Sequence, residues 1–158
     1  MMKKIGMWIG TIAGAALGAF LYGIEKLTGL SVYTLLINVD FIPVVRHAMG
    51  NPFLELLLHF VVSWTIGVVF VYLLDRWNKQ KSPFRFALSA FLSLVAAATY
   101  VPLTILAVQP TPAVTDIQAV SYWLAGHAIY GLFLVGSYDF LKGTAWRKRV
   151  EGKKMALS

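Results

Sequence analysis

Long apolar stretches alternate with short polar segments along this chain. Each apolar stretch contains about 20 residues or more, which is the length that an α-helix needs to cross a hydrocarbon layer about 30 Å thick. The four stretches cover residues 5–24, 52–74, 84–107 and 119–141. We therefore expect an all-α fold, namely a polytopic membrane protein that folds as a compact antiparallel bundle of four transmembrane helices, in a single membrane domain over residues 1–158.

The segment between the first two apolar stretches, residues 27–51, has a different pattern. It contains LSVYTLLINVDFIPVV, which is apolar but too short to span a membrane. This pattern predicts an interfacial or re-entrant helix on the extracytoplasmic face. The alternative is a loop whose apolar residues pack on the bundle. Within the third stretch, Pro102 lacks the N–H of a regular helix and is expected to kink it.

Glycines recur every fourth residue in the first stretch, at Gly6, Gly10, Gly14 and Gly18. A glycine costs a soluble helix about 1 kcal/mol relative to alanine, but in a membrane a strip without side chains allows two helix backbones to approach closely. Two later helices carry small residues at the same spacing, namely Ser63 and Gly67, or Ser89, Ser93 and Ala97. Packing within the chain is favoured over contact between two copies.

Composition agrees with a membrane protein. Of the 158 residues, 58% are hydrophobic and 13% are charged, and the mean hydropathy is +0.70. This is more apolar surface than one soluble core of this size requires. The first stretch is too long for the apolar part of a signal peptide and no A-x-A site follows it, so we expect it to be retained. The absence of cysteine excludes disulfides and thiol chemistry.

Basic residues are concentrated on one side of the predicted bundle. Twelve of the fourteen fall on that side: Lys3, Lys4, Arg76, Lys79, Lys81, Arg85, Lys142, Arg147, Lys148, Arg149, Lys153 and Lys154. Because cytoplasmic segments are enriched in Lys and Arg, both termini are expected in the cytoplasm. The net charge of +7 then reflects orientation rather than nucleic-acid binding. Anionic lipid headgroups are the expected partner of the basic tail, residues 142–158.

Ionisable residues at membrane depth form the candidate site, because such residues are costly in lipid and are functional by default. Glu55 and His59 are four residues apart and share one helix face. His127 lies at nearly the depth of His59, about 10 to 12 Å below the outer boundary. Four further polar residues are expected at this level, namely Tyr22, Glu25, Tyr100 and Thr104. An outward-facing polar pocket would keep all of them away from lipid.

Several interpretations of this pocket are open. The polar groups could hold the helices together by hydrogen bonds, or histidine could make the site sensitive to protonation. His59, His127 and Glu55 are ligand types that suit zinc, and two histidines on facing helices could ligate haem or surround another small ligand. Of these possibilities, we expect that the protein has no cofactor, and zinc and haem are the alternatives.

An enzymatic function is not expected. Ser63 lies one turn from His59, and Ser137 lies near Asp139, but neither pair has a third group that would orient a base. Asp139 is instead expected to face Arg76 or Arg147 at the cytoplasmic interface.

Four segments of the chain resemble the YagU-like and YqhR-like bacterial inner-membrane proteins. They are IGTIAGAALGAFLYGIEKL, HFVVSWTIGVVF, YVPLTILAVQPTP and AGHAIYGLFLVGSY. The resemblance implies four helices in the bacterial cytoplasmic (inner) membrane and, through the YagU-like group, a link to acid resistance. We expect a small accessory or stress-related protein that binds a partner, a proton or an ion. The alternatives are a subunit of an oligomeric transporter or channel, whose copies meet at the glycine strip, and a metal- or haem-binding protein.

Overall fold

The computed structural model describes residues 2–38, 40, 51–77 and 82–155, with side chains as far as residue 142. The described residues form helices α1 (Met2–Thr28), α2 (Val32–Ile37), α3 (Pro52–Arg76), α4 (Ser82–Ala97), α5 (Tyr100–Leu106) and α6 (Ile117–Met155). Four of their segments are long and apolar enough to cross a membrane, and they are Met2–Thr28, Pro52–Arg76, Ser82–Leu106 and Ile117–Lys142. The predicted all-α membrane fold with four spanning helices is thereby confirmed.

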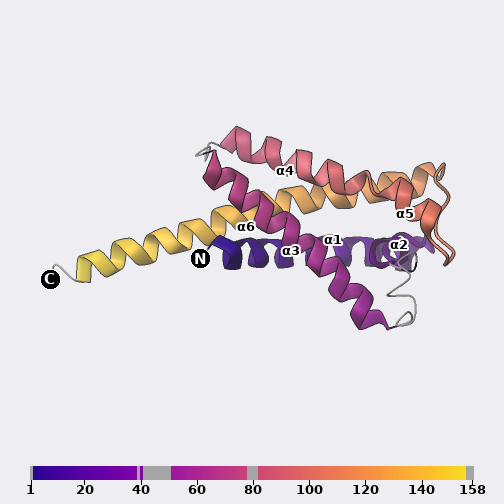
Figure 1. Cartoon of the computed structure of the whole chain (residues 1–158), viewed down its shortest axis with the longest axis horizontal. Coiled ribbons are helices and arrows are strands. Elements are labelled where there is room, and N and C mark those ends of the chain that lie inside the picture. Colours follow the sequence, from indigo (N-terminus) through magenta and orange to yellow (C-terminus); the bar gives the residue numbers. More distant parts are fainter. Residues whose placement is uncertain (1, 39, 41–50, 78–81, 156–158) are drawn as a thin grey trace.

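The spanning helices alternate in direction, and they pack side by side without closing into a ring (Figure 1). Helix α1 packs along both α3 and α6, and α4 packs along the other side of α6. Helices α3 and α4 follow one another in sequence, yet they contact each other only sparsely. The spatial order is therefore α3, α1, α6, α4, with a gap in the packing between the first and the last helix.

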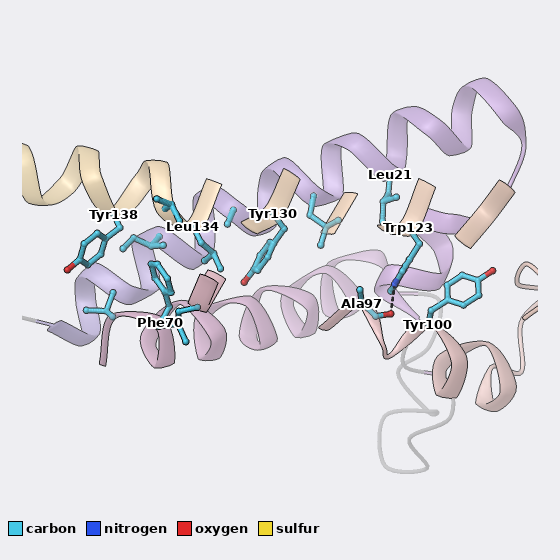
Figure 2. Close-up of a cluster of buried hydrophobic side chains, with 14 of the residues drawn as sticks. Leu21, Phe70, Ala97, Tyr100, Trp123, Tyr130, Leu134 and Tyr138 are labelled. Atoms are coloured by element: carbon cyan, nitrogen blue, oxygen red, sulfur yellow. Dashed lines mark hydrogen bonds between the residues drawn. The ribbon is translucent and has the colours of Figure 1, made fainter. Parts of the chain in front are cut away.

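Aromatic side chains of α6 form much of the core. Trp123, Tyr130 and Tyr138 are almost completely buried and point from α6 toward the other helices (Figure 2). Tyr138 packs edge-on against Phe70 of α3, with ring centroids 5.8 Å apart. Such aromatic pairs stabilise a core by about 1 kcal/mol beyond the burial of their surface. Helix α6 therefore supplies aromatic side chains against which the C-terminal part of α3 packs.

The third predicted span is broken rather than kinked. Helix α4 ends at Ala97, and α5 begins at Tyr100 after a turn. Pro102 lacks the N–H that would bond to the carbonyl of Ala98 in a continuous helix. The carbonyl of Ala97 instead accepts a hydrogen bond of 2.9 Å from Nε1 of Trp123 (Figure 2). The break therefore ties this span to α6.

Helix α6 continues beyond the predicted span. The sequence pattern predicts a helix over residues 119–141, whereas α6 runs to Met155. At 1.5 Å per residue its 39 residues reach about 58 Å, almost twice the thickness of the hydrocarbon layer. Figure 1 shows this end of α6 extending past the beginning of α1.

Two ion pairs join helices at the end of the bundle where α1 begins, which we call the basic end. Asp75 of α3 pairs with Lys142 of α6 at 3.0 Å. Asp139 of α6 pairs with Arg85 of α4, rather than with Arg76 as the sequence suggested. The side chain of Arg147 and the predicted cytoplasmic residues 78–81 lie outside the described part. Ion pairs at the surface of a protein contribute about 0 to 1 kcal/mol each.

The segment between α1 and α3 forms a short helix at the opposite end of the bundle. Helix α2 packs on α1 and buries Val32 and Leu35. Its N-terminus is held by Glu25, whose carboxylate accepts hydrogen bonds of 2.8 Å from the amides of Tyr33 and Thr34. Residues 39 and 41–50, which complete the predicted interfacial or re-entrant segment, lie outside the described residues.

Candidate functional site

The glycine strip of α1 lies against α3. A Cβ added to Gly10 would overlap the carbonyl oxygen of Ser63, and one added to Gly67 would overlap the carbonyl oxygen of Gly6. A Cβ on Gly14 would come within 2.7 Å of the Ser63 hydroxyl. The two backbones are therefore in direct contact, which is the arrangement that small residues allow in membranes.

The last glycine of the strip and the small residues of α4 face elsewhere. The nearest atom to a Cβ on Gly18 is a ring carbon of Tyr33 in α2, at 4.0 Å. On α4, Ser93 faces α6, because its hydroxyl oxygen would lie 2.8 Å from a Cβ on Gly131. Of the two candidate partners for the strip, the face of α3 with Ser63 and Gly67 is the one in contact.

Close approach of α1 and α3 brings two polar side chains of α3 to carbonyl groups of α1. Ser63 donates a hydrogen bond of 2.7 Å to the carbonyl of Gly10. Nε2 of His59 lies 3.2 Å from the carbonyl oxygen of Gly14. A carbonyl can only accept, so Nε2 carries the proton. A neutral His59 therefore keeps its lone pair on Nδ1.

Tyr130 of α6 completes this contact. Its hydroxyl lies 3.1 Å from Oγ of Ser63. Because the single hydrogen of the Ser63 hydroxyl goes to Gly10, the hydroxyl of Tyr130 is the donor. One hydrogen-bonded chain thus joins α6, α3 and α1 in the middle of the bundle.

His127 is held by its own helix. It is 4% exposed, and its Nδ1 lies 2.9 Å from the carbonyl oxygen of Trp123, one turn earlier. The two rings also pack together, with centroids 4.7 Å apart. Since the carbonyl accepts, Nδ1 carries the proton, and a neutral His127 keeps its lone pair on Nε2. The two histidines therefore use opposite nitrogens to bond to the backbone.

A cavity of about 480 Å³ lies where α3 and α4 fail to pack together. Its walls are mostly apolar, and its polar lining residues are Asn38, His59, Ser63, Thr99, His127 and Tyr130. Val62 of α3 and Val95 of α4 also line it, and they are 59% and 54% exposed on the surface of the bundle. The cavity therefore opens sideways between the two helices. His127 also lines a second hollow of about 420 Å³ between α4 and α6.

Two residues that the sequence analysis did not single out bound this region at the α2 end. Asp40 is completely buried, and its carboxylate accepts hydrogen bonds from the amides of Val108 and Gln109, after α5. Asn38 is 5% exposed and accepts a bond of 2.9 Å from the amide of Asp40. Nδ2 of Asn38 is buried without a partner in the described part of the chain. In the sequence, ionisable Asp40 stands within the apolar run LLINVDFI, and this position could have indicated that its carboxylate is buried and hydrogen-bonded.

Three of the predicted pocket residues lie around α2 instead of lining the cavity. Glu25 caps α2, and Tyr22 is half exposed and packs edge-on against Tyr33, with centroids 5.2 Å apart. Glu55 is partly exposed and acts on Tyr33 through its charge. Burial, followed by the effects of Tyr22, Glu25 and Glu55, raises the pKa of Tyr33 above its ordinary value.

The two predicted residues of the third span also lie outside the cavity wall. Tyr100 is buried and donates a hydrogen bond of 3.0 Å to the carbonyl of Ala113. Thr104 has a buried hydroxyl without a partner in the described residues. Of the seven residues predicted to share a pocket, His59 and His127 are the two that line this cavity.

The predicted zinc ligands do not form a cluster. Among the side chains that the structure describes, no three from His, Asp or Glu are close enough to hold a metal ion. Glu55 is not part of the cavity wall that contains both histidines. The described geometry therefore offers two imidazoles without the carboxylate that the sequence suggested as a third ligand.

Comparison of the chain with protein-family models, with curated proteins and with solved structures yields no match. The resemblance to the YagU-like and YqhR-like proteins therefore stays a prediction that rests on the four segments quoted above.

Proposed function

We propose that this integral membrane protein is a non-enzymatic binding protein that takes its ligand from the membrane, through the opening between α3 and α4. Its cellular role would be that of an accessory protein that responds to the bound molecule. The observation that carries the proposal is the cavity of about 480 Å³ that opens sideways between two spanning helices and is lined by the buried His127 and the partly buried His59.

The walls of the cavity support binding of a largely apolar ligand. Binding sites for small molecules are usually concave and apolar, with a few placed polar groups that orient the ligand. Here Val62 and Val95 lie at the exposed edges, while His59 and His127 lie deeper and are fixed by backbone carbonyls. A ligand that enters from the lipid would meet apolar walls first and polar groups last.

The proposed site opens sideways into the membrane, whereas the sequence predicted a polar pocket that faces outward. The residues expected to make the pocket polar at its outer rim, Tyr22, Glu25 and Glu55, surround α2 rather than the cavity. Protonation of the histidines would still alter ligand binding, because each histidine has one nitrogen left for a ligand. A proton-linked role is therefore compatible with ligand binding.

Labelling with a small lipophilic diazirine tests the proposal. Phenyl(trifluoromethyl)diazirine partitions into bilayers, and on illumination it gives a carbene that reacts with the side chains it can reach. Tyr130 and Tyr138 are an internal comparison, since both are buried on α6 and only Tyr130 lines the cavity. We expect labelling of Tyr130, detected by peptide mass spectrometry, to exceed that of Tyr138 by about tenfold or more.

A pair of valine variants on α3 provides the control. Val62→Trp places an indole at the mouth of the cavity, whereas Val69→Trp changes another exposed valine that does not line it. We expect Val62→Trp to abolish labelling of Tyr130 and Val69→Trp to leave it unchanged. Equal labelling of Tyr130 and Tyr138 in the unmodified protein would refute a cavity that is open to the membrane.

A further inference from the structure

We infer that the ligand of the cavity is an uncharged lipid that carries a free hydroxyl group, of the kind found in diacylglycerols and long-chain alcohols. This inference rests on the proposed function and specifies its ligand. It follows from the hydrogen-bonding groups that the cavity leaves unused and from the charges that its wall lacks.

The unused acceptors come from the two histidines. Nε2 of His59 and Nδ1 of His127 donate to the carbonyls of Gly14 and Trp123. Among the described residues, the remaining nitrogen of each ring has no hydrogen-bond partner. In their neutral forms both rings therefore offer a lone pair, which accepts a hydrogen bond from a ligand that carries an O–H or N–H.

The unused donor is the side-chain amide of Asn38. Its oxygen is occupied by the amide of Asp40, while Nδ2 is buried without a partner in the described residues. This amide nitrogen has almost no accessible surface, so the cavity does not reach it and the histidine acceptors determine the ligand chemistry. A hydroxyl group can donate to an imidazole lone pair, whereas an ether or ester oxygen cannot.

Charge distinguishes this ligand from other membrane components. Among the residues that the structure describes, those that line the cavity include no Asp, Glu, Lys or Arg. A phosphate or carboxylate headgroup would have no cation to pair with there, and a divalent metal ion would have no carboxylate. Burying an unpaired charge in an apolar site costs far more than burying a hydroxyl that forms hydrogen bonds. The lining therefore favours an uncharged headgroup over phospholipids, fatty-acid anions and metal ions.

Photoactivatable lipids in phosphatidylcholine vesicles test the inference with the full-length protein. The probes are diazirine-bearing diacylglycerol and hexadecanol, the methyl ether of each, and the corresponding fatty acid at neutral pH. A single hydrogen bond to the ligand corresponds to about a fivefold change in occupancy. We expect each hydroxyl probe to label the peptide of Tyr130 at least about fivefold more than its ether. Whichever of diacylglycerol and hexadecanol labels more strongly shows whether a lipid with two acyl chains or one alkyl chain fits the cavity.

Replacing the imidazole of His127 by a phenyl ring keeps an aromatic side chain but removes the lone pair, so it shows whether the hydroxyl preference depends on this residue. We expect His127→Phe to reduce the excess of hydroxyl labelling over ether labelling, with the remaining excess due to His59, while labelling by the ether itself stays unchanged. The ether thus reports on whether the cavity is still intact. Ile105→Phe, at an exposed position of α5 outside the cavity wall, should leave the hydroxyl preference unaltered.

The outcomes separate the inference from the proposed function. Equal labelling by hydroxyl and ether probes, or labelling by the fatty acid that matches the alcohol, would overturn the hydroxyl assignment and leave a membrane-accessible cavity. A stoichiometric metal ion in elemental analysis of the purified protein would overturn it as well. Failure of every probe to label Tyr130 above Tyr138 would overturn the proposed function itself.

Discussion

At the residue scale, missing side chains on α1 determine where the polar groups of α3 lie. Gly10 and Gly14 let the backbone of α1 approach α3 so closely that Ser63 and His59 reach carbonyl groups of the opposite helix. The bond of His59 uses Nε2 and leaves Nδ1 without a hydrogen-bond partner among the described residues. The glycine strip therefore acts as a scaffold for the candidate site, without itself contacting a ligand.

Alanine substitutions along α1 test this scaffold. Gly10→Ala would place a methyl group against the backbone of Ser63, whereas a Cβ at Gly23 meets nothing within 4 Å. We expect Gly10→Ala to lower the free energy of unfolding by about 1 to 3 kcal/mol, which is typical of overpacking, and Gly23→Ala to change it by less than about 1 kcal/mol. Unfolding in mixed micelles with increasing sodium dodecyl sulfate measures both values. Equal effects of the two variants would contradict close packing of α1 on α3.

Asp40 is the second residue whose role follows from its contacts. Its buried carboxylate accepts from the amides of Val108 and Gln109. In Asp40→Asn one oxygen becomes an NH₂ group, which cannot accept from either amide. We expect hydrogen exchange at these two amides to accelerate by about tenfold or more. The amide of Ala119, which bonds to Asp116, is the internal control and should be unaffected.

At the element scale, α2 depends on one side chain of α1. Six residues are too few for a stable isolated helix, and the carboxylate of Glu25 satisfies two of its first amides and the hydroxyl of Thr34. Helix α2 and the turn after it supply Leu36 and Asn38 to the cavity wall. Capping of α2 and closure of this end of the cavity are therefore coupled.

Limited proteolysis measures this dependence. We expect Glu25→Ala to unfold α2 and to speed chymotrypsin cleavage after Tyr33 by about fivefold or more, because removal of a helix cap costs about 1 kcal/mol. Glu55→Ala is a matched control, since the charge of Glu55 also raises the pKa of Tyr33, and Glu55 accepts no hydrogen bond from α2 among the described residues. If Glu55→Ala accelerated cleavage equally, the effect would be one of charge and not of capping.

The elements were largely predictable from sequence, and the site was predictable only in part. Long apolar runs identify spanning helices because length and hydropathy suffice, and a rise of 1.5 Å per residue placed His59 and His127 at one depth. The rotation of each helix about its axis depends on contacts between helices, which spacing within one helix does not encode. Glu25 lies eleven residues beyond Gly14, the α1 residue that His59 contacts, so it is about 16 Å away from the level predicted for it. Tyr100 points away from the cavity, and its hydroxyl donates to Ala113. The hydrogen bonds of Asp40 were not predicted because its partners are backbone amides about 70 residues away in the sequence.

At the scale of the whole molecule, the start of α1 and the end of α3 lie at the basic end, and α6 extends beyond it on the same side (Figure 1). The chain has no cysteine, so single cysteines can report which side of the membrane each end faces. We predict that a membrane-impermeant maleimide labels Leu27→Cys in intact cells, and labels Lys4→Cys only after the membrane is ruptured. The reverse pattern would contradict the orientation inferred from the basic residues.

A structure determined in lipid nanodiscs would show whether α3 and α4 remain apart and hold a lipid between them. With a bound antibody fragment as a size marker, electron cryomicroscopy should reveal elongated density that enters between Val62 and Val95 and ends near His59 and His127. Direct packing of α3 on α4, with both valines buried against each other and no density between the helices, would contradict the account.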